Sequence, residues 1–124
     1  MKKFILIWGA PTTGKSTLAQ NVSQELGLPW FSTDQIRMLM KIYAHRNETG
    51  WLFLPKWHDS VETFLGHYSP EKIVEMEFAQ AHDVWPWIQT MIDDCYTYTH
   101  GCIIEWVNIT PELVVKNLTD RNDV

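Results

Sequence analysis

The sequence has few cysteines, no long hydrophobic run and a deficit of basic residues. Cys95 and Cys102 are too few for the disulfide framework of a small secreted protein. No apolar stretch approaches the roughly 18 residues of a membrane-spanning helix, and the run at residues 4–8 is shorter than the roughly 7–15 residues of an export signal. Ten basic against 15 acidic residues give a net charge of −5. These features predict a cytoplasmic protein with no membrane or nucleic-acid partner.

Internal repeats, low-complexity tracts and linkers rich in Pro, Gly or Ser are also missing. The chain has 124 residues, of which 45% are hydrophobic, and a chain of this length can bury one core without a metal or disulfides. We therefore predict a single domain over residues 1–124.

Three apolar segments predict strands. Residues 4–8 are apolar at every position and end at Gly9, which is typical of a strand buried on both faces in a parallel sheet. Residues 28–31 predict a short second strand and residues 102–107 a third. We expect a loop with a short helix at residues 45–67.

Helical patterns alternate with these strands. They cover residues 16–26, residues 34–43, a long segment from Ser69 towards Cys95, and a last segment from Thr110. Ser32 and Gln35 fit a capping box for the second helix, and Pro86 predicts a kink or a break in the third. On this third helix, the polar residues Glu75, Glu77 and Gln80 are expected to face solvent. The alternation of strands and helices indicates an α/β fold with a parallel sheet.

One motif has specific chemistry. The segment after the first strand reads Gly-x-x-x-x-Gly-Lys-Ser, the phosphate-binding P-loop, and comprises Gly9, Ala10, Pro11, Thr12, Thr13, Gly14, Lys15 and Ser16. Its glycines let successive backbone N–H groups converge on phosphate oxygens at the start of a helix. Lys15 is expected to reach the β- and γ-phosphates, Ser16 to bind Mg²⁺, and Thr17 to contact the next phosphate. The motif predicts binding of ATP with Mg²⁺.

Three segments resemble P-loop small-molecule and nucleotide kinases: residues 4–17, residues 28–37 and residues 101–107. The second is similar to the segment after the second strand in 2-phosphoglycerate-kinase-like and zeta-toxin-like ATP-binding proteins of AAA type. The resemblance implies a three-layer P-loop NTPase fold with a parallel sheet. It also implies transfer of phosphate from ATP to a hydroxyl of a small-molecule acceptor.

Asp34, Arg37 and Glu105 are the further site candidates. Asp34 and Arg37 are three residues apart at a helix start, so they share one face. They follow a strand expected to neighbour the P-loop strand, at the carboxyl end of the sheet, where open α/β folds bind ligands. Asp34 is a candidate catalytic base or Mg²⁺ ligand, and Arg37 could hold a substrate anion. The alternative is a capping Asp with a solvated Arg. Glu105 ends an apolar strand as metal-binding carboxylates do, and its alternative is an exposed strand-end glutamate.

The sequence departs from the kinase pattern at its C-terminal end. Two further strands and an arginine-bearing lid are expected in the family, and neither is visible after Thr110. We therefore expect a chain cut short before the lid, or a natural short form, with the P-loop strand left as an apolar sheet edge. Such an edge favours homo-oligomerisation. Two other interpretations stay open: a GTPase-like regulator, although an Asn-Lys-x-Asp motif is missing, and a non-catalytic nucleotide-binding module.

Overall fold

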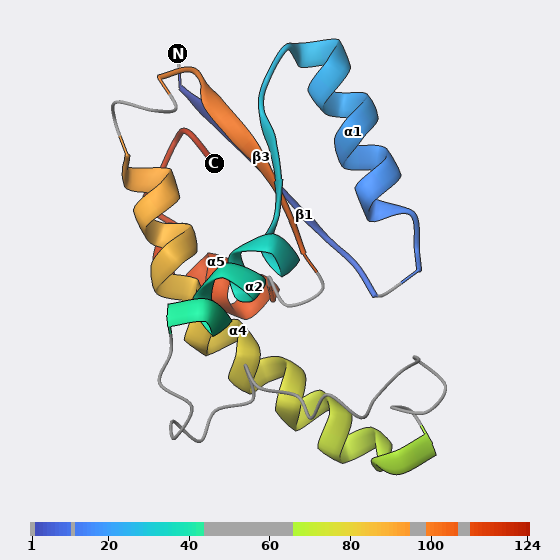
Figure 1. Ribbon diagram of the computed structural model, residues 1–124. Helices are drawn as coiled ribbons and strands as arrows, with labels where there is room; N and C mark the ends of the chain where they lie inside the picture. Colours follow the sequence, from blue (N-terminus) through green and yellow to red (C-terminus); the bar gives the residue numbers. More distant parts are fainter. Residues whose placement is uncertain (1, 11, 44–65, 95–98, 107–109) are drawn as a thin grey trace.

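A computed structural model describes residues 2–10, 12–43, 66–94, 99–106 and 110–124 (Figure 1). The expected loop and helix at residues 45–67 therefore lie almost entirely outside the described residues. Within them the chain is an α/β structure in which three parallel strands alternate with helices, as predicted. Among the described residues, no helix has both the length and the apolar character needed to cross a membrane.

The sheet contains β1 (Lys3–Trp8), β3 (Gly101–Trp106) and β2 (Trp30–Ser32), in the order β1-β3-β2. All pairings are parallel. β3 is central and its six residues are all buried, whereas β1 and β2 are the outer strands of the described sheet. The edge position expected for the P-loop strand is thus confirmed. The expectation that the second strand neighbours the P-loop strand is wrong, because β3 pairs with both of them.

Gly101 is the residue that lets β1 and β3 meet at their first pair. Its φ of +98° is in the left-handed region, and a Cβ built on it would lie 1.7 Å from the Lys3 carbonyl oxygen. Only glycine tolerates both conditions, because it has no Cβ to strain the backbone or to collide.

The two faces of the sheet have different roles. In the register, Phe31 pairs with Ile104, and both contribute to the main apolar core with residues of α4 (Pro70–Asp93) and α5 (Pro111–Leu118). Alternation along the strands places Ser32 and Glu105 on the opposite face. Figure 1 shows α1 (Lys15–Leu26) on one side of the strands and α4 with α5 on the other.

The helices begin where their sequence signals predict. Ser69 caps α4 by accepting a hydrogen bond from the Lys72 backbone N–H at 3.2 Å, with proline at the first helical position. Thr110 caps α5 in the same way, and α1 ends at Gly27, which adopts a left-handed conformation. The remaining helix, α2 (Thr33–Tyr43), follows β2 without an intervening loop.

Pro86 lies inside α4 without ending it. The helix runs on to Asp93 and changes direction along its length (Figure 1), so the predicted kink is observed and the predicted break is wrong. Residues before and after Pro86, among them Val84 and Ile88, are fully buried against the core. Pro86 has no N–H and cannot donate a helical backbone hydrogen bond. The packing of residues before and after it against the core stabilises the helix at this point.

Cys102 is a free thiol buried in the core, as expected. Burial raises the pKa of this thiol to about 12, so it stays protonated and unreactive at neutral pH. Cys95 lies outside the described residues.

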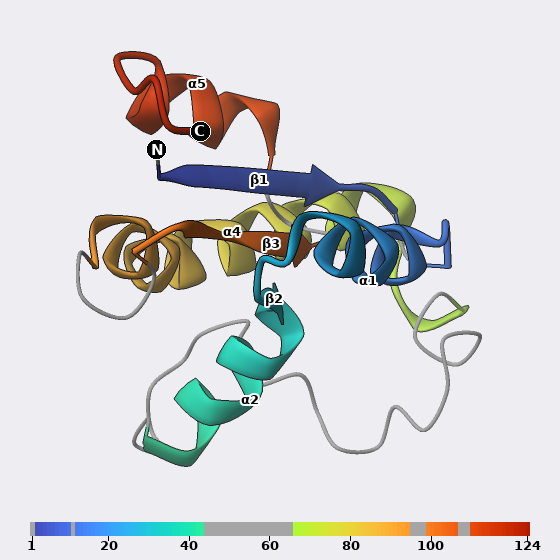
Figure 2. The same ribbon diagram turned by 90° about the horizontal axis from the view of Figure 1, so that it is seen from above.

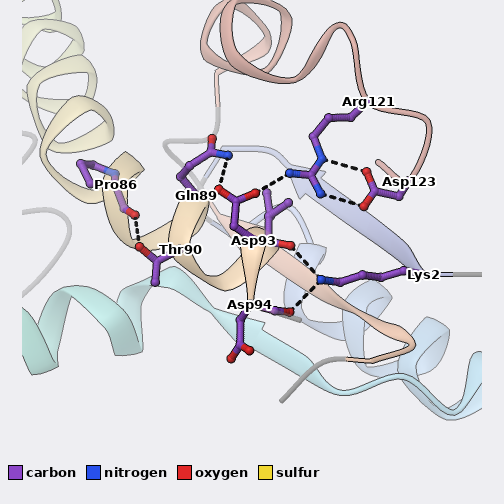
Figure 3. Close-up of polar contacts among 9 residues, drawn as sticks. Lys2, Pro86, Gln89, Thr90, Asp93, Asp94, Arg121 and Asp123 are labelled. Carbon is purple, nitrogen blue, oxygen red and sulfur yellow. Dashed lines mark hydrogen bonds and ion pairs between the residues drawn. The ribbon is translucent and has the colours of Figure 1, made fainter. Parts of the chain in front are cut away.

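A charged cluster fixes the C-terminal segment beside the start of β1 (Figure 3). Arg121 binds both carboxylate oxygens of Asp123 at 2.8 Å and contacts Asp93 of α4 at 2.5 Å. The Asp123 carbonyl accepts a hydrogen bond from the Phe4 backbone N–H at 2.6 Å, on the outer edge of β1. The C-terminal segment lies beside the start of β1 in both ribbon views (Figures 1 and 2).

This cluster predicts a pH-dependent contribution to stability. Hydrogen bonds from Gln89 and Arg121 lower the pKa of Asp93, and the one from Arg121 lowers that of Asp123. A lowered carboxyl pKa stabilises the fold above the ordinary value near 3.8, and the gain is lost as pH falls through the folded value. We expect Arg121→Ala to lower the free energy of unfolding by about 1 kcal/mol at pH 7, since these side chains are partly exposed.

Urea unfolding at several pH values checks this. The difference between Arg121→Ala and the unsubstituted chain should shrink as pH falls below about 4, where the aspartates become protonated. Arg121→Lys is the control, because it keeps the charge and loses the two-pronged geometry. A difference that stays constant from pH 7 to 3 would contradict the ion-pair explanation.

Candidate functional site

The P-loop forms a tight turn between β1 and α1. Gly9 and Ala10 follow β1, and Thr12 and Gly14 adopt left-handed conformations with φ of 63° and 84°. The Thr13 hydroxyl donates a hydrogen bond to the Ala10 carbonyl at 2.7 Å, closing the loop on itself. Positive φ at alternate positions of this turn helps successive N–H groups to converge, which suits an anion. Pro11 lies outside the described residues.

The start of α1 is open to a phosphate. Gly14 occupies the N-cap position and supplies no capping side chain, and the first turn holds no acidic residue. The first helical backbone bond runs from the Leu18 N–H to the Gly14 carbonyl at 2.9 Å, so the N–H groups before it remain for a ligand. The positive end of the helix dipole therefore faces the loop with no acidic side chain in its own first turn.

Lys15, Ser16 and Glu105 come together at this point. The Ser16 hydroxyl donates a hydrogen bond to Glu105 Oε1 at 3.0 Å, and Lys15 Nζ lies 4.0 Å from Glu105 Oε2. Glu105 is 2% exposed, so the alternative of a solvated strand-end glutamate is wrong. The exposed side chain of Thr17 belongs to the same first turn of α1.

Glu105 is held from its backbone as well as its side chain. The Thr33 hydroxyl, fully buried at the start of α2, donates to the Glu105 carbonyl at 3.5 Å. Glu105 Oε2 is buried and has no hydrogen-bond partner among the described residues. A buried carboxylate oxygen without a donor is costly, so this atom is suited to a ligand group.

A pocket of about 310 Å³ opens beside the Ser16–Glu105 contact. Its described lining consists of Ser16 from α1, Trp30 and Ser32 from β2, Gln35 from α2, and Glu105 from β3. Two parallel strands, β2 and β3, thus bring residues to the start of α1 and α2, as expected for a ligand site in an α/β sheet.

Asp34 and Arg37 share a helix face, as predicted, and form an ion pair at 3.5 Å. Arg37 also donates to the Gln80 side-chain oxygen at 3.1 Å, which ties α2 to α4. Asp34 lines an adjacent, largely apolar surface hollow with Gln35, Met38 and Leu39, and Gln35 also borders the pocket beside Ser16. The described lining of the pocket beside Ser16 includes neither Asp34 nor Arg37.

Sequence reasoning missed four residues of this region. Trp30, Ser32 and Gln35 line the pocket, although the pattern indicated only a strand and a cap. Alternation along β2 was an available signal, since it places Trp30 and Ser32 on one face. Gln80 is 2% exposed, so the expectation that it faces solvent is wrong: the Arg37 hydrogen bond compensates its burial.

Mg²⁺ fits the donors that this site offers. The Ser16 hydroxyl and the Glu105 carboxylate are hard oxygen donors in contact with each other, and Glu105 Oε2 has no hydrogen-bond partner among the described residues. In the part of the chain that the structure describes, no group of three His, Cys, Asp or Glu side chains could hold a metal ion. Mg²⁺ bound here would therefore depend on nucleotide phosphates for further ligands, as it does in other phosphate sites.

The comparison with known families agrees with this geometry. The model of the ATPase family associated with various cellular activities (AAA) matches residues 5–73, more than half of the chain. The chain belongs to the AAA family of ATPases. As a member of it, the chain is a P-loop nucleotide-binding protein of the ATP-binding class. Searches among curated proteins and among solved structures gave no match.

The match to the AAA family covers part of the site. Residues 5–73 include the P-loop, the pocket residues of β2 and α2, and the Asp34–Arg37 pair. Glu105 lies beyond them, and its place in this AAA-family site rests on the hydrogen bond with Ser16.

Proposed function

We propose that this AAA-family chain transfers the γ-phosphoryl group of ATP to a hydroxyl group of a small molecule. The observation that supports the proposal is the Ser16–Glu105 contact, which borders a pocket of about 310 Å³. Nucleotide binding alone requires only the P-loop. The pocket beside Ser16 and Glu105 would in addition provide room for an acceptor next to the reacting phosphate.

The site residues have different proposed roles in nucleotide binding and in phosphoryl transfer. Lys15 would neutralise the β- and γ-phosphates, and Ser16 with Glu105 would hold Mg²⁺, which supplies charge neutralisation during transfer. Asp34 is the other carboxylate proposed as a base, and Arg37 would support it through their ion pair. The geometry favours Glu105 over Asp34 for contact with the acceptor, because only Glu105 lines the pocket beside Ser16.

Membership of the AAA family supports one second candidate, ATP hydrolysis or nucleotide-dependent regulation without a small-molecule acceptor. Calorimetric titration with ATP and Mg²⁺, combined with a screen for acceptor-stimulated ADP formation, separates the two. ADP formation that depends on an added hydroxyl compound supports the transferase. ATP binding whose turnover no acceptor accelerates supports the second candidate.

We also propose that the chain self-associates through the outer edge of β1. The Asp123 carbonyl pairs with Phe4 at the start of this edge, and the strand continues to Trp8, whose side chain is 56% exposed. An exposed apolar edge is a site for pairing with a second copy. Sedimentation at tens of micromolar should give a mass above 14.6 kDa, and Trp8→Lys should reduce it, since an edge charge opposes pairing. A monomer at that concentration would contradict the proposal.

A further inference from the structure

The outer edge of β1 is covered at its start. The Phe4 N–H donates a hydrogen bond to the Asp123 carbonyl at 2.6 Å, on the side away from β3. The preceding Lys3 N–H donates to the His100 carbonyl at 3.1 Å, just before β3 begins. Backbone N–H groups alternate between the two sides of a strand, so the Leu6 N–H points outward like that of Phe4. Among the described residues, no strand pairs with β1 on this outer side.

The cover consists of residues 121–124, here called the edge strap. Figure 2 shows this segment returning from α5 towards the start of β1. Its turn is closed by the Arg121 N–H, which donates to the Leu118 carbonyl at 3.1 Å. The Arg121 guanidinium contacts both oxygens of Asp123 at 2.8 Å and Asp93 of α4 at 2.5 Å. Arg121 therefore holds in place the residue whose carbonyl reaches Phe4.

The start of β1 has an attachment to α4 that does not involve the strap. Lys2 Nζ donates hydrogen bonds to the carbonyls of Ile92 and Asp94 at 3.1 and 2.7 Å, on either side of Asp93 (Figure 3). β1 also pairs with β3 over six residues. Because these contacts do not depend on Arg121, a released strap leaves β1 in place with more of its outer edge exposed.

The strap and a second strand compete for one backbone group. A strand that runs along the whole outer edge of β1 needs the Phe4 N–H, which the Asp123 carbonyl occupies. Folded proteins commonly protect an edge strand by covering it with a loop. We propose that the edge strap is an autoinhibitory contact, which limits pairing of β1 with a second copy of this chain while Arg121 holds it. This inference rests on the proposed self-association through β1 and adds its regulation.

Arg121→Ala tests the strap by its effect on self-association. A second copy that pairs only with a released edge binds more weakly by the fraction of chains in which the strap is closed. We expect the dissociation constant of self-association to fall about 3- to 10-fold in the variant, the effect of one neutral hydrogen bond. Sedimentation over a range of protein concentrations measures this constant.

Two further variants accompany Arg121→Ala. Lys72→Ala is the matched control, because it removes an equal charge and the ion pair with Glu75 at 2.9 Å, in the first turn of α4. It should leave the dissociation constant unchanged. Asp123→Asn keeps the contact of Arg121 with Asp93 and should lower the constant by less than Arg121→Ala. If the unsubstituted chain associates and Arg121→Ala associates no more tightly than Lys72→Ala, the inference is overturned while the proposed self-association stands.

Hydrogen exchange tests the strap in the absence of association. At a protein concentration too low for self-association, the Phe4 N–H should exchange faster in Arg121→Ala than in the unsubstituted chain, because its partner carbonyl is released more often. The Ile5 N–H points to β3 and is the internal reference, whose exchange should be equal in both proteins. Equal exchange of Phe4 in the two proteins would overturn the role of Arg121.

Adding Trp8→Lys to Arg121→Ala tests whether the gained association uses the edge of β1. The gain should disappear in the double variant, since a charge on the edge opposes strand pairing. A gain that persists would mean association through another surface and would overturn the inference. If the unsubstituted chain is a monomer at tens of micromolar and Arg121→Ala associates, the strap is supported and the unsubstituted chain does not self-associate by itself. Monomers in both proteins would overturn both proposals.

Discussion

Replacing Lys15 with alanine will weaken ATP binding about ten- to a hundredfold. The substitution removes a charge-assisted contact to the phosphates worth roughly 1.5–3 kcal/mol. Lys15 is 12% exposed and lies 4.0 Å from a buried carboxylate oxygen, so its amine is directed to the site and not to solvent. Calorimetric titration with ATP and ADP in the presence of Mg²⁺ measures the effect.

Lys116→Ala is the matched control for Lys15→Ala. Lys116 is exposed in the last turn of α5, and its loss changes the net charge equally without touching the P-loop. High salt screens long-range attraction between the protein and ATP. It should therefore reduce only that part of each variant's loss of ATP affinity that comes from such attraction. If Lys15→Ala binds ATP as tightly as Lys116→Ala, the assignment of the loop as the phosphate site is wrong.

Glu105→Gln should lower the rate of ADP formation by roughly 10²-fold or more, with ATP affinity changed by no more than a few fold. Glutamine keeps the shape of the side chain and can still accept the hydrogen bond from Ser16. It loses the negative charge that would attract Mg²⁺ and receive a proton. Single-turnover measurements with saturating ATP separate the chemical step from nucleotide binding.

Asp34→Asn is the companion variant that decides between the two carboxylates. Asp34 is 56% exposed in its side chain, pairs with Arg37 and lines a different hollow, so we expect a smaller loss of rate than in Glu105→Gln. A larger loss in Asp34→Asn would return the role of base to Asp34 and require α2 to move towards the P-loop. A loss of ATP binding with turnover per bound nucleotide unchanged would give Asp34 a structural or metal-binding role instead.

The position and contacts of β1 show how much of a strand's environment can be predicted from a run of apolar residues. The apolar run at residues 4–8 correctly predicted a strand and, with the strand order of the resembling kinases, an edge position. It could not predict that Arg121 and Asp123 from the other end of the chain would fix a backbone bond to Phe4. Such a contact joins segments more than a hundred residues apart and leaves no periodic signal in either of them.

The local structure and the phosphate loop of this protein follow from short-range features of its amino-acid sequence. Apolar runs, caps such as Ser69 and Thr110, and the P-loop motif act over a few neighbouring residues, so their consequences are visible in the order of the amino acids. Which polar residues line the site depends instead on how the strands pair. Ser16 and Glu105 meet because β1 and β3 are parallel neighbours, and Trp30 joins them because β2 alternates its side chains beside β3. Asp34, nearer in sequence to the P-loop than Glu105, lines a different hollow, since strand pairing and not chain distance sets which side chains share a pocket.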